Sequence, residues 1–374
     1  MSMGKQILIT GGAGFIGAHL ANELLSHGYK VRALDNLVPQ VHGPERQRPA
    51  YLASDVELTV GDIRNCDLVS RALEGVDAVV HLVAIVGVGQ SMYQIADYTG
   101  VNNLGTAVLL QALTAHPVES LVVASSMSIY GEGLYRDSQG NIRPARERPL
   151  EQLQMADWDV YDESGERLIP VATPEDKPPN LASVYALSKF DQERLCLMIG
   201  RAYRFRAVAL RFFNTYGPYQ ALSNPYTGVL SNFASRVLNG NRPLIFEDGL
   251  QQRDFVSVYD VARACRLALE TPRAAGLALN ISSGQPMTVR EVALRTIRAI
   301  GNQTLEPEIT GRYRAGDIRH CFADISLARK VLGWRPEVTL ERGLEDLASW
   351  LTGQTAIDRG LEARAELAAR GLMV

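Results

Sequence analysis

The chain has 374 residues, 46% of them hydrophobic and 21% charged, which is ordinary for a globular protein and excludes disordered and fibrous classes. Its 38 lysines and arginines against 41 aspartates and glutamates give a net charge of −3, so no basic surface for nucleic acid or an anionic membrane is expected. At roughly 100–200 residues per domain, the length predicts two domains, or one large α/β unit with a lobe.

The four cysteines lie far apart in the chain and form no CxxC pair. We therefore expect neither a disulfide framework nor a metal site, and the unpaired thiols fit a reducing cytoplasm. The sequence shows no signal peptide, and no apolar stretch approaches the ~20 residues that a membrane span needs. These features predict a cytoplasmic protein without a nucleic-acid or membrane partner.

The first part of the chain alternates short apolar runs with helical patterns. Because the apolar runs are continuous, they predict a parallel sheet that is covered by helices on both faces. Strands are expected at residues 5–9, 30–35, 56–60, 77–83 and 119–125, and helices from the first glycine-rich loop to about His27 and over 97–115.

The segment 132–181 breaks this rhythm, because it is polar, rich in proline and without clear periodicity. A loop of this length is unusual in a compact domain, so we interpret it as a lid, an interface insertion or a poorly ordered excursion. Beyond it, helices are expected at 182–202, 226–240, 259–270 and 288–300, strands at 206–211, 254–258 and 277–281, and an Ala-rich helical tail at 353–374.

Three glycines, Gly11, Gly14 and Gly17, separate the first strand from the first helix. This context is typical of a dinucleotide-binding loop: a tight turn, a close approach of backbone to pyrophosphate, and helix N–H groups that face the phosphates. Asp35 ends the second strand, where a carboxylate accepts hydrogen bonds from a ribose diol and favours NAD over NADP. Asp62 ends the third strand and is expected beside the adenine.

Tyr185 and Lys189 stand four residues apart and so share one face of a predicted helix. Ser126 ends the fifth strand, and the carboxyl ends of parallel strands border the ligand crevice. The YxxxK spacing alone occurs by chance in many chains, so its meaning depends on the surrounding motifs.

With these motifs in order, the chain resembles the extended short-chain dehydrogenase/reductase family over about residues 5–350, and within it the nucleotide-sugar epimerases and dehydratases. The motifs that carry the resemblance are TGGAGFIG at 10–17, SSMSIYG at 125–131, YALSK at 185–189, RFFNTYGP at 211–218, QRDFVSVYDVA at 252–262 and YRAGDIRH at 313–320. The resemblance implies a Rossmann doubly wound parallel sheet with a smaller α/β C-terminal lobe for the substrate.

The resemblance also implies roles. Tyr185 would remove a proton from a sugar hydroxyl while a hydride passes to NAD, Lys189 would favour the phenolate and hold the nicotinamide ribose, and Ser126 would bind the reacting oxygen. A tyrosine pKa of about 10 must fall for such work near neutrality. The implied NAD-binding residues are Gly11, Gly14, Phe15, Ile16, Gly17, Asp35, Asn36, Asp62, Ile63, Leu82, Ala84, Asn102, Tyr185 and Lys189. The implied substrate-binding residues are Ser126, Met127, Ser128, Asn214, Phe246, Arg253, Arg314 and Asp317.

The two residues that follow Ser126 indicate which of the family's reactions is expected. Sugar dehydratases carry an Asp-Glu pair where this chain has Met127 and Ser128, and decarboxylases carry a Glu in place of Ser128. A thioether cannot donate a proton, so water loss is disfavoured. Oxidation to a ketone and return of the hydride remain, which predicts an epimerase with NAD regenerated in each cycle. A net reductase would normally use NADPH, against which Asp35 argues.

The sugar is less sharply defined. The segments at 34–43, 86–99 and 313–325 most resemble bacterial 4-epimerases of dTDP-linked 6-deoxyhexoses such as dTDP-L-rhamnose. A UDP-hexose or UDP-uronate 4-epimerase and a CDP-sugar 2-epimerase stay open as alternatives, with a 4-ketosugar reductase and a catalytically silent NAD-binding protein behind them. The resemblance further implies a homodimer packed through helices near 97–115 and 182–202. We expect the NAD-binding domain in 1–212 and 243–270, and the substrate lobe in 213–242 and 271–352.

Overall fold

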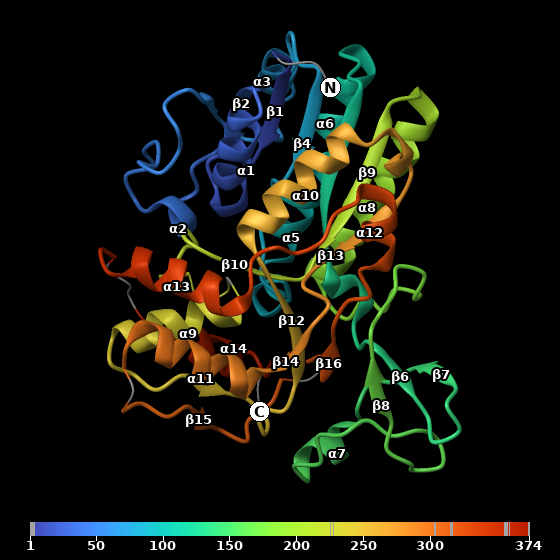
Figure 1. Ribbon diagram of the computed structural model, residues 1–374, viewed down its shortest axis with the longest axis vertical. Coiled ribbons are helices and arrows are strands. Elements are labelled where there is room, and N and C mark those ends of the chain that lie inside the picture. Colours follow the sequence, from blue (N-terminus) through green and yellow to red (C-terminus); the bar gives the residue numbers. More distant parts are fainter. Residues whose placement is uncertain are drawn as a thin grey trace.

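A seven-stranded parallel sheet makes up the larger part of the molecule (Figure 1). The computed structural model describes residues 4–224, 226, 228–302, 304–314, 317–354, 358 and 360–372. From edge to edge the strands are β13 (Ala278–Ile281), β9 (Arg206–Phe212), β5 (Ser120–Ser126), β4 (Ala78–His81), β1 (Gln6–Thr10), β2 (Lys30–Asp35) and β3 (Glu57–Val60). The strand order turns back at β1, and the crevice at such a point is where doubly wound sheets bind ligands.

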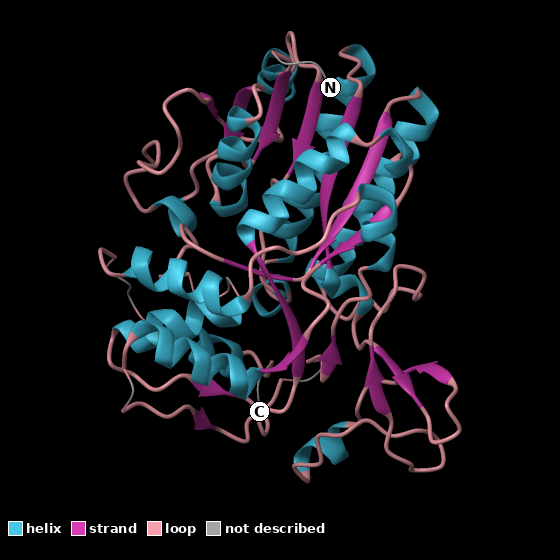
Figure 2. Cartoon of the chain, viewed as in Figure 1, coloured by secondary structure: helices cyan, strands magenta, loops and turns pink. Residues whose placement is uncertain are grey.

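Helices cover both faces of this sheet (Figure 2). Side chains alternate along β1, so that Ile7 and Ile9 enter one apolar core while Leu8 enters the other. The first core is closed by α1 (Phe15–Ser26), α10 (Val258–Glu270) and α12 (Ser326–Leu332), and the second by α3 (Cys66–Ala72), α6 (Gly105–Ala115) and α8 (Val184–Tyr203). The expected doubly wound α/β fold is confirmed.

The helix expected over 97–115 is interrupted. The structure has α5 (Ile95–Tyr98), a π-helical stretch (Thr99–Leu104) and then α6. Such π-helical segments are rare, and those that occur are often found at functional sites. Here the stretch contains Asn102, whose side chain turns inward and is fully buried.

A smaller lobe lies below the carboxyl ends of the strands (Figure 1). Its strands are β10 (Asn214–Tyr216), β12 (Gln252–Ser257), β14 (Pro286–Thr288) and β16 (His320–Cys321), with the pair β11 (Leu244–Ile245) and β15 (Glu308–Ile309). Its helices are α9 (Val229–Leu238), α11 (Val289–Ile300), α13 (Leu340–Leu351) and α14 (Gly360–Ala369). Short turns elsewhere are α2 (Pro39–His42), α4 (Val88–Ser91), η2 (Met127–Tyr130) and η3 (Pro272–Ala274).

The sheets divide the chain differently from the expected boundaries at three strands. β13 was expected in the lobe, but it pairs with β9 at the edge of the main sheet. β11 and β12 were expected with the NAD-binding domain, but β11 pairs with β15 of the lobe, and β12 pairs with β10, β14 and β16 of the lobe. Helix α10, which follows β12 directly, packs against α1 on one face of the main sheet. The chain therefore passes from the lobe to the main sheet at Ser257, which ends β12 and caps α10.

The proline-rich segment 132–181 contains secondary structure that no pattern in its sequence predicts. It forms an antiparallel sheet in the order β7 (Ile142–Pro144), β6 (Leu134–Arg136) and β8 (Ile169–Val171). The short helix α7 (Leu150–Gln154) lies between β7 and β8 in the chain. A small core of Tyr135, Val160 and Leu168 holds it together. It projects from the body beside the lobe (Figure 1). The sequence showed no periodicity here because three-residue strands are too short to show a period of two. The lid or interface role expected of this segment stays a prediction.

Within the described residues, no helix combines the length and the apolar character that a membrane crossing requires. In the same part of the chain, no three His, Cys, Asp or Glu side chains are grouped so that they could hold a metal ion.

Candidate active site

A cavity of about 800 Å³ runs along the carboxyl ends of the central strands and on between the sheet and the lobe. Most of the residues singled out in the sequence line it. They are Gly11, Gly14, Phe15, Ile16, Gly17, Asp35, Asn36, Ile63, Leu82, Ala84, Ser126, Met127, Ser128, Tyr185, Lys189, Asn214, Phe246, Arg253, Arg314 and Asp317. Segments far apart in the sequence thus meet in one site.

The glycine loop leaves no room for side chains. Gly11 has a φ of +72°, and a Cβ there would lie 3.0 Å from the backbone nitrogen of Val83. A Cβ on Gly17 would lie 2.3 Å from the carbonyl oxygen of Gly11. Helix α1 begins without a side-chain cap and without an acidic residue in its first turn, so its free N–H groups remain for an anion. This loop therefore fits the pyrophosphate of a dinucleotide.

Asp35 ends β2 at the cavity with its carboxylate buried. One oxygen accepts a 2.9 Å hydrogen bond from the Leu37 N–H and the other a 3.1 Å bond from the Ala13 N–H. The Nε2 atom of His42 lies 3.6 Å from the same carboxylate. A carboxylate oxygen has about two acceptor positions, so Asp35 retains capacity for a ribose diol. His42 also lines the cavity, and no motif pointed to it.

Two residues with implied cofactor contacts do not line this cavity. The Asp62 carboxylate binds the Arg64 guanidinium at 2.7 and 2.9 Å, and these bonds lower the pKa of Asp62. Asn102 accepts from the Ile85 N–H at 2.8 Å and donates to the Ile85 carbonyl at 3.1 Å, which fixes the backbone of a cavity residue. The contacts expected of Asp62 and Asn102 with the cofactor stay predictions.

The three residues of the expected reactive group meet at one wall of the cavity. Ser126 lies at the end of β5, and its hydroxyl oxygen accepts a 2.9 Å hydrogen bond from Ser128. Tyr185 and Lys189 lie in the first turns of α8, where the Ser183 side chain caps the helix. The Ser126 hydroxyl is a hydrogen-bond partner of the Tyr185 phenol and opposes the effect of burial on its pKa.

Burial dominates the protonation of this group. It raises the pKa of Tyr185 above its usual value, and the bond with Ser126 offsets only part of this rise. It also lowers the pKa of Lys189 to about 8, with Cys196 and Glu193 opposing the shift. A positive charge close to Tyr185 would favour its phenolate.

A buried polar network lies behind Lys189. Its ammonium donates to the Gln192 side-chain oxygen at 2.7 Å, and the Gln192 amide donates to Thr106 at 2.8 Å. His81 bonds Thr106 at 2.9 Å and Thr10 at 2.7 Å, and burial holds its pKa at about 3, so the imidazole is neutral. Sequence reasoning missed Gln192. It stands three residues after Lys189 on the same helix face, which was the available signal.

Helix α8 is locked against the sheet by an ion pair. The Glu193 carboxylate binds the Arg211 guanidinium of β9 through bonds of 2.6 and 2.9 Å, and it accepts a 2.6 Å bond from Ser125 of β5. A two-point contact between Arg and carboxylate restricts both distance and angle. Since Ser125 precedes Ser126, this contact fixes the helix of Tyr185 relative to the strand of Ser126.

The lobe supplies the polar residues at the other end of the cavity. The Asn214 amide donates to the Asp254 carbonyl at 3.1 Å and lies 3.7 Å from the Met127 sulfur. Arg253 donates to backbone carbonyls, those of Gln252 at 2.9 Å and Arg319 at 3.0 Å. In these contacts the Arg253 guanidinium therefore forms no ion pair with a carboxylate.

Arg314 contacts two further cavity residues. Its guanidinium donates to Asp317 at 3.2 Å and lies 4.9 Å from the centre of the Phe246 ring. Burial raises the pKa of the Asp317 carboxyl, but the charges of Arg314 and Arg253 outweigh this, so the pKa lies below its usual value. Of the motif that joins them, Ala315 and Gly316 lie outside the described residues.

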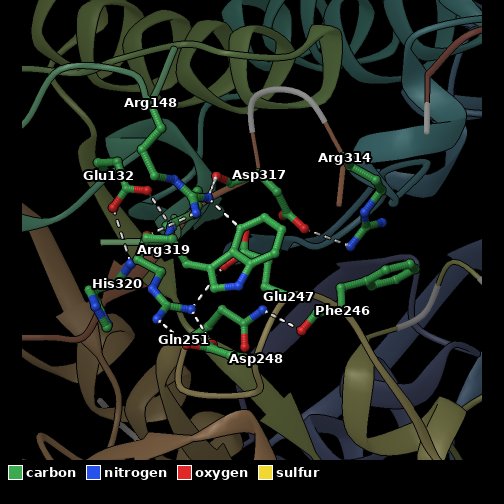
Figure 3. A network of polar contacts seen from close by, with 12 residues as sticks. Glu132, Arg148, Phe246, Glu247, Asp248, Gln251, Arg314, Asp317, Arg319 and His320 are labelled. Carbon is green, nitrogen blue, oxygen red and sulfur yellow. Dashed lines mark hydrogen bonds and ion pairs between the residues drawn. The ribbon is translucent and has the colours of Figure 1, made fainter. Parts of the chain in front are cut away.

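The insertion reaches this end of the cavity through Arg148 (Figure 3). Its guanidinium donates to the Glu247 carboxylate at 2.8 Å and to the Asp317 carbonyl at 2.9 Å. Arg319 binds the other oxygen of Glu247 at 2.9 Å. The three charged side chains are almost completely buried. The contacts link segment 132–181 to Phe246, the neighbour of Glu247.

Comparison with known proteins places this geometry in a family. Residues 7–282 match the NAD dependent epimerase/dehydratase family. The dTDP-L-rhamnose 4-epimerase of Burkholderia thailandensis is 35% identical over 353 residues, which cover 93% of this chain and 95% of that protein. The chain belongs to the NAD dependent epimerase/dehydratase family.

Solved structures agree. The UDP-glucose 4-epimerase of Thermus thermophilus in complex with NAD is 30% identical with a TM-score of 0.73, covering 93% of this chain and 99% of that one. The UDP-glucuronic acid 4-epimerase of Bacillus cereus, in complex with UDP-glucuronic acid and NAD, is 26% identical with a TM-score of 0.75 and the same coverage. The expected nucleotide-sugar 4-epimerase with NAD as its cofactor is confirmed.

Proposed function

We propose that this 4-epimerase interconverts the C4 epimers of a dTDP-linked 6-deoxyhexose. The observation that carries the sugar class is the apolar wall of the cavity. Val86, Val88 and Met92 are each about two-fifths or more exposed on the protein surface, yet all three line the cavity, as does Met127. A methyl group at C6 fits such a wall, whereas a hydroxymethyl or carboxylate would lose hydrogen bonds there. The similarity to the Burkholderia enzyme supports the same choice.

The chain's own residues divide the acid–base work. Tyr185 takes the proton of the C4 hydroxyl and returns it after the 4-keto sugar has turned its other face. Ser126 donates a hydrogen bond to the C4 oxygen in both directions. Lys189 holds a positive charge near the phenol and binds the nicotinamide ribose. When bound, NAD supplies the hydride acceptor and donor for C4.

The nucleotide and the cofactor are held at opposite ends of the cavity. Gly11, Gly14 and Gly17 bind the NAD pyrophosphate and Asp35 the adenosine ribose. At the lobe, Arg253 and Arg314 bind the substrate diphosphate. Charged forks suit phosphate, and their restriction to one end keeps the sugar free to turn. The remaining proposed contacts are those of Phe15, Ile16, Asn36, Asp62, Ile63, Leu82, Ala84 and Asn102 with NAD, and of Met127, Ser128, Asn214, Phe246 and Asp317 with the substrate.

A panel of dTDP-, UDP-, CDP- and GDP-sugars, followed by NMR in deuterated water, tests the sugar class. We expect inversion at C4 of a dTDP-6-deoxyhexose without deuterium in the sugar. Faster turnover of a UDP-hexose or UDP-uronate, or inversion at C2 of a CDP-sugar, would replace the proposal. Deuterium beside the ketone would indicate enolisation instead of hydride return.

The quaternary state that we propose is a homodimer in the cytoplasm. Apolar side chains are exposed on the helices expected at the interface: Leu104 precedes α6, and Leu187 and Met198 lie on α8, each more than half exposed. Their burial against a second copy is the usual reason for such a surface. Light scattering of the wild type and of Leu187→Lys tests this: the wild type is expected as a dimer and the variant as a monomer. All four cysteines are free, as a reducing compartment requires.

A further inference from the structure

The C-terminal helix α14 forms part of the cavity wall. Arg364 and Leu367 of this helix line the cavity, with Gly360 at its start. The helix lies in the lobe (Figure 1), far beyond the residues 7–282 that match the family. No motif in the sequence gave it a role.

Helix α14 is anchored on both sides of the cavity. The Glu366 carboxylate accepts hydrogen bonds from Tyr93 at 3.0 Å and from Tyr226 at 3.2 Å. Tyr93 follows α4 on the side of the main sheet, whereas Tyr226 precedes α9 of the lobe. Asp358, just before the helix, binds Arg236 of α9 at 2.8 Å with both side chains mostly buried. These contacts place Arg364 at a defined position over the cavity.

Arg364 lines the cavity without an ion-pair partner among the described residues. Its guanidinium lies 5.1 Å from the centre of the Phe246 ring, and the Arg314 guanidinium also lies over this ring. Its Nη2 atom is buried and, within the described part of the chain, has no hydrogen-bond partner. No carboxylate of the described residues forms an ion pair with it. Burial and the charge of Arg312 lower the pKa of Arg364, with the charge of Glu308 opposing the shift.

The neighbouring arginines differ in whether they have a carboxylate partner. Arg236 has Asp358 as its partner and Arg314 has Asp317, whereas Arg253 is held only by carbonyl groups. Arg253 and Arg364 therefore line one end of the cavity, and neither forms an ion pair with a carboxylate of the described residues, although Asp317 lies close enough to Arg253 to respond to its charge. A partly buried charge without an ion-pair partner is favoured by an anion that neutralises it. A nucleoside diphosphate carries the negative charge and the oxygen acceptors that these groups lack.

We propose that Arg364 binds the diphosphate of the substrate together with Arg253, so that α14 is a part of the substrate site. This rests on the proposed function only in so far as the ligand is a nucleoside diphosphate sugar. It does not depend on the sugar or on the base. The bond lies at the phosphates, away from C4, and holds the nucleotide while the sugar turns.

The test compares the NAD-loaded full-length enzyme with its Arg364→Gln variant by calorimetry, using dTDP, UDP and thymidine as probes. Arg342→Gln, which removes an exposed arginine of α13 outside the cavity, is the matched control. We expect Arg364→Gln to weaken diphosphate binding about tenfold or more, since bonds to charged groups contribute on this scale. Thymidine binding, NAD content and the control variant remain unchanged.

Two results would overturn the assignment of Arg364. One is diphosphate binding in Arg364→Gln within about twofold of the wild type, which is less than the loss of one charged bond. The other is an equal loss for thymidine and dTDP, which would indicate a contact with the base or a displaced helix. A wild type that prefers UDP to dTDP contradicts the proposed nucleotide. In that case, a loss of UDP binding in Arg364→Gln still supports the assignment.

Discussion

The Lys189 ammonium donates a 2.7 Å hydrogen bond to the side-chain oxygen of Gln192, which is itself fully buried. Gln192 in turn is held by Thr106, so the direction of the Lys189 side chain is set from behind the cavity. In Gln192→Met the ammonium loses this acceptor in a buried place, and its pKa, already at about 8, falls further. In Gln192→Glu a negative charge raises it.

We therefore expect opposite shifts in the pH profiles of these two variants. Because the protonated Lys189 is the active form, kcat/KM is lost as pH rises through its pKa. The alkaline limb should move to lower pH in Gln192→Met and to higher pH in Gln192→Glu, each by about one unit, which corresponds to ~1.4 kcal/mol. Superimposable profiles of wild type and variants would show that Gln192 has only a packing role.

The Tyr185 phenol is the expected acid–base group, and Tyr185→Phe removes only its hydroxyl. We expect kcat to fall at least ~100-fold, the usual contribution of a positioned acid–base group, with NAD still bound. Tyr203→Phe is the matched control, since Tyr203 is an exposed tyrosine at the end of the same helix. Steady-state assays and NAD content measure both. If Tyr185→Phe keeps more than a few per cent of activity, another residue must be the base.

The Asp35 carboxylate accepts backbone hydrogen bonds and keeps room for a ribose diol. Asp35→Ala removes these acceptors and also the charge that repels a 2′-phosphate. We expect NAD affinity to fall by about tenfold or more, while NADP affinity falls less or rises. Calorimetry with both cofactors measures the ratio, with Asp55→Ala, an exposed aspartate, as control. An unchanged NAD to NADP preference would exclude Asp35 from the ribose contact.

The positions of the glycine loop and of Ser126 could be predicted because each stands at the carboxyl end of a predicted strand, and parallel topology brings these ends together. Tyr185 and Lys189 could be predicted from their spacing on one helix, whereas Arg253 and Arg314 followed only from the motifs of the family. Short-range pattern therefore determined both the local structure and the meeting place of the glycine loop and Ser126.

The remaining parts depend on contacts that no local pattern encodes. Gln192 lies on a predicted helix face, but its partner Thr106 comes from another helix. Arg364 reaches the cavity only because Glu366 binds tyrosines from two distant segments. The pairing of β13 with β9 likewise spans about seventy residues of chain, and parallel pairing leaves no turn signal in the sequence.

Glu247 provides the last prediction, because its backbone has a φ of +53°, in the left-handed region that side chains rarely adopt. Such a conformation costs about 1–3 kcal/mol and persists only where the surroundings enforce it. Its carboxylate is bound by Arg148 from the insertion and Arg319 from the lobe, all of them buried (Figure 3). Arg148→Met removes one of the two arginines, and Glu247 remains buried with half of its charge compensation.

We expect Arg148→Met to lower the free energy of unfolding by about 3 kcal/mol, as when one partner of a buried pair is removed. Because Arg148 also holds the Asp317 carbonyl, KM for the nucleotide sugar should rise while kcat changes little. Arg146→Met, which removes an exposed arginine two residues away, should change neither quantity. Chemical denaturation and steady-state kinetics measure the two effects separately. Loss of stability with an unchanged KM would make the insertion a structural support that does not act on the substrate site.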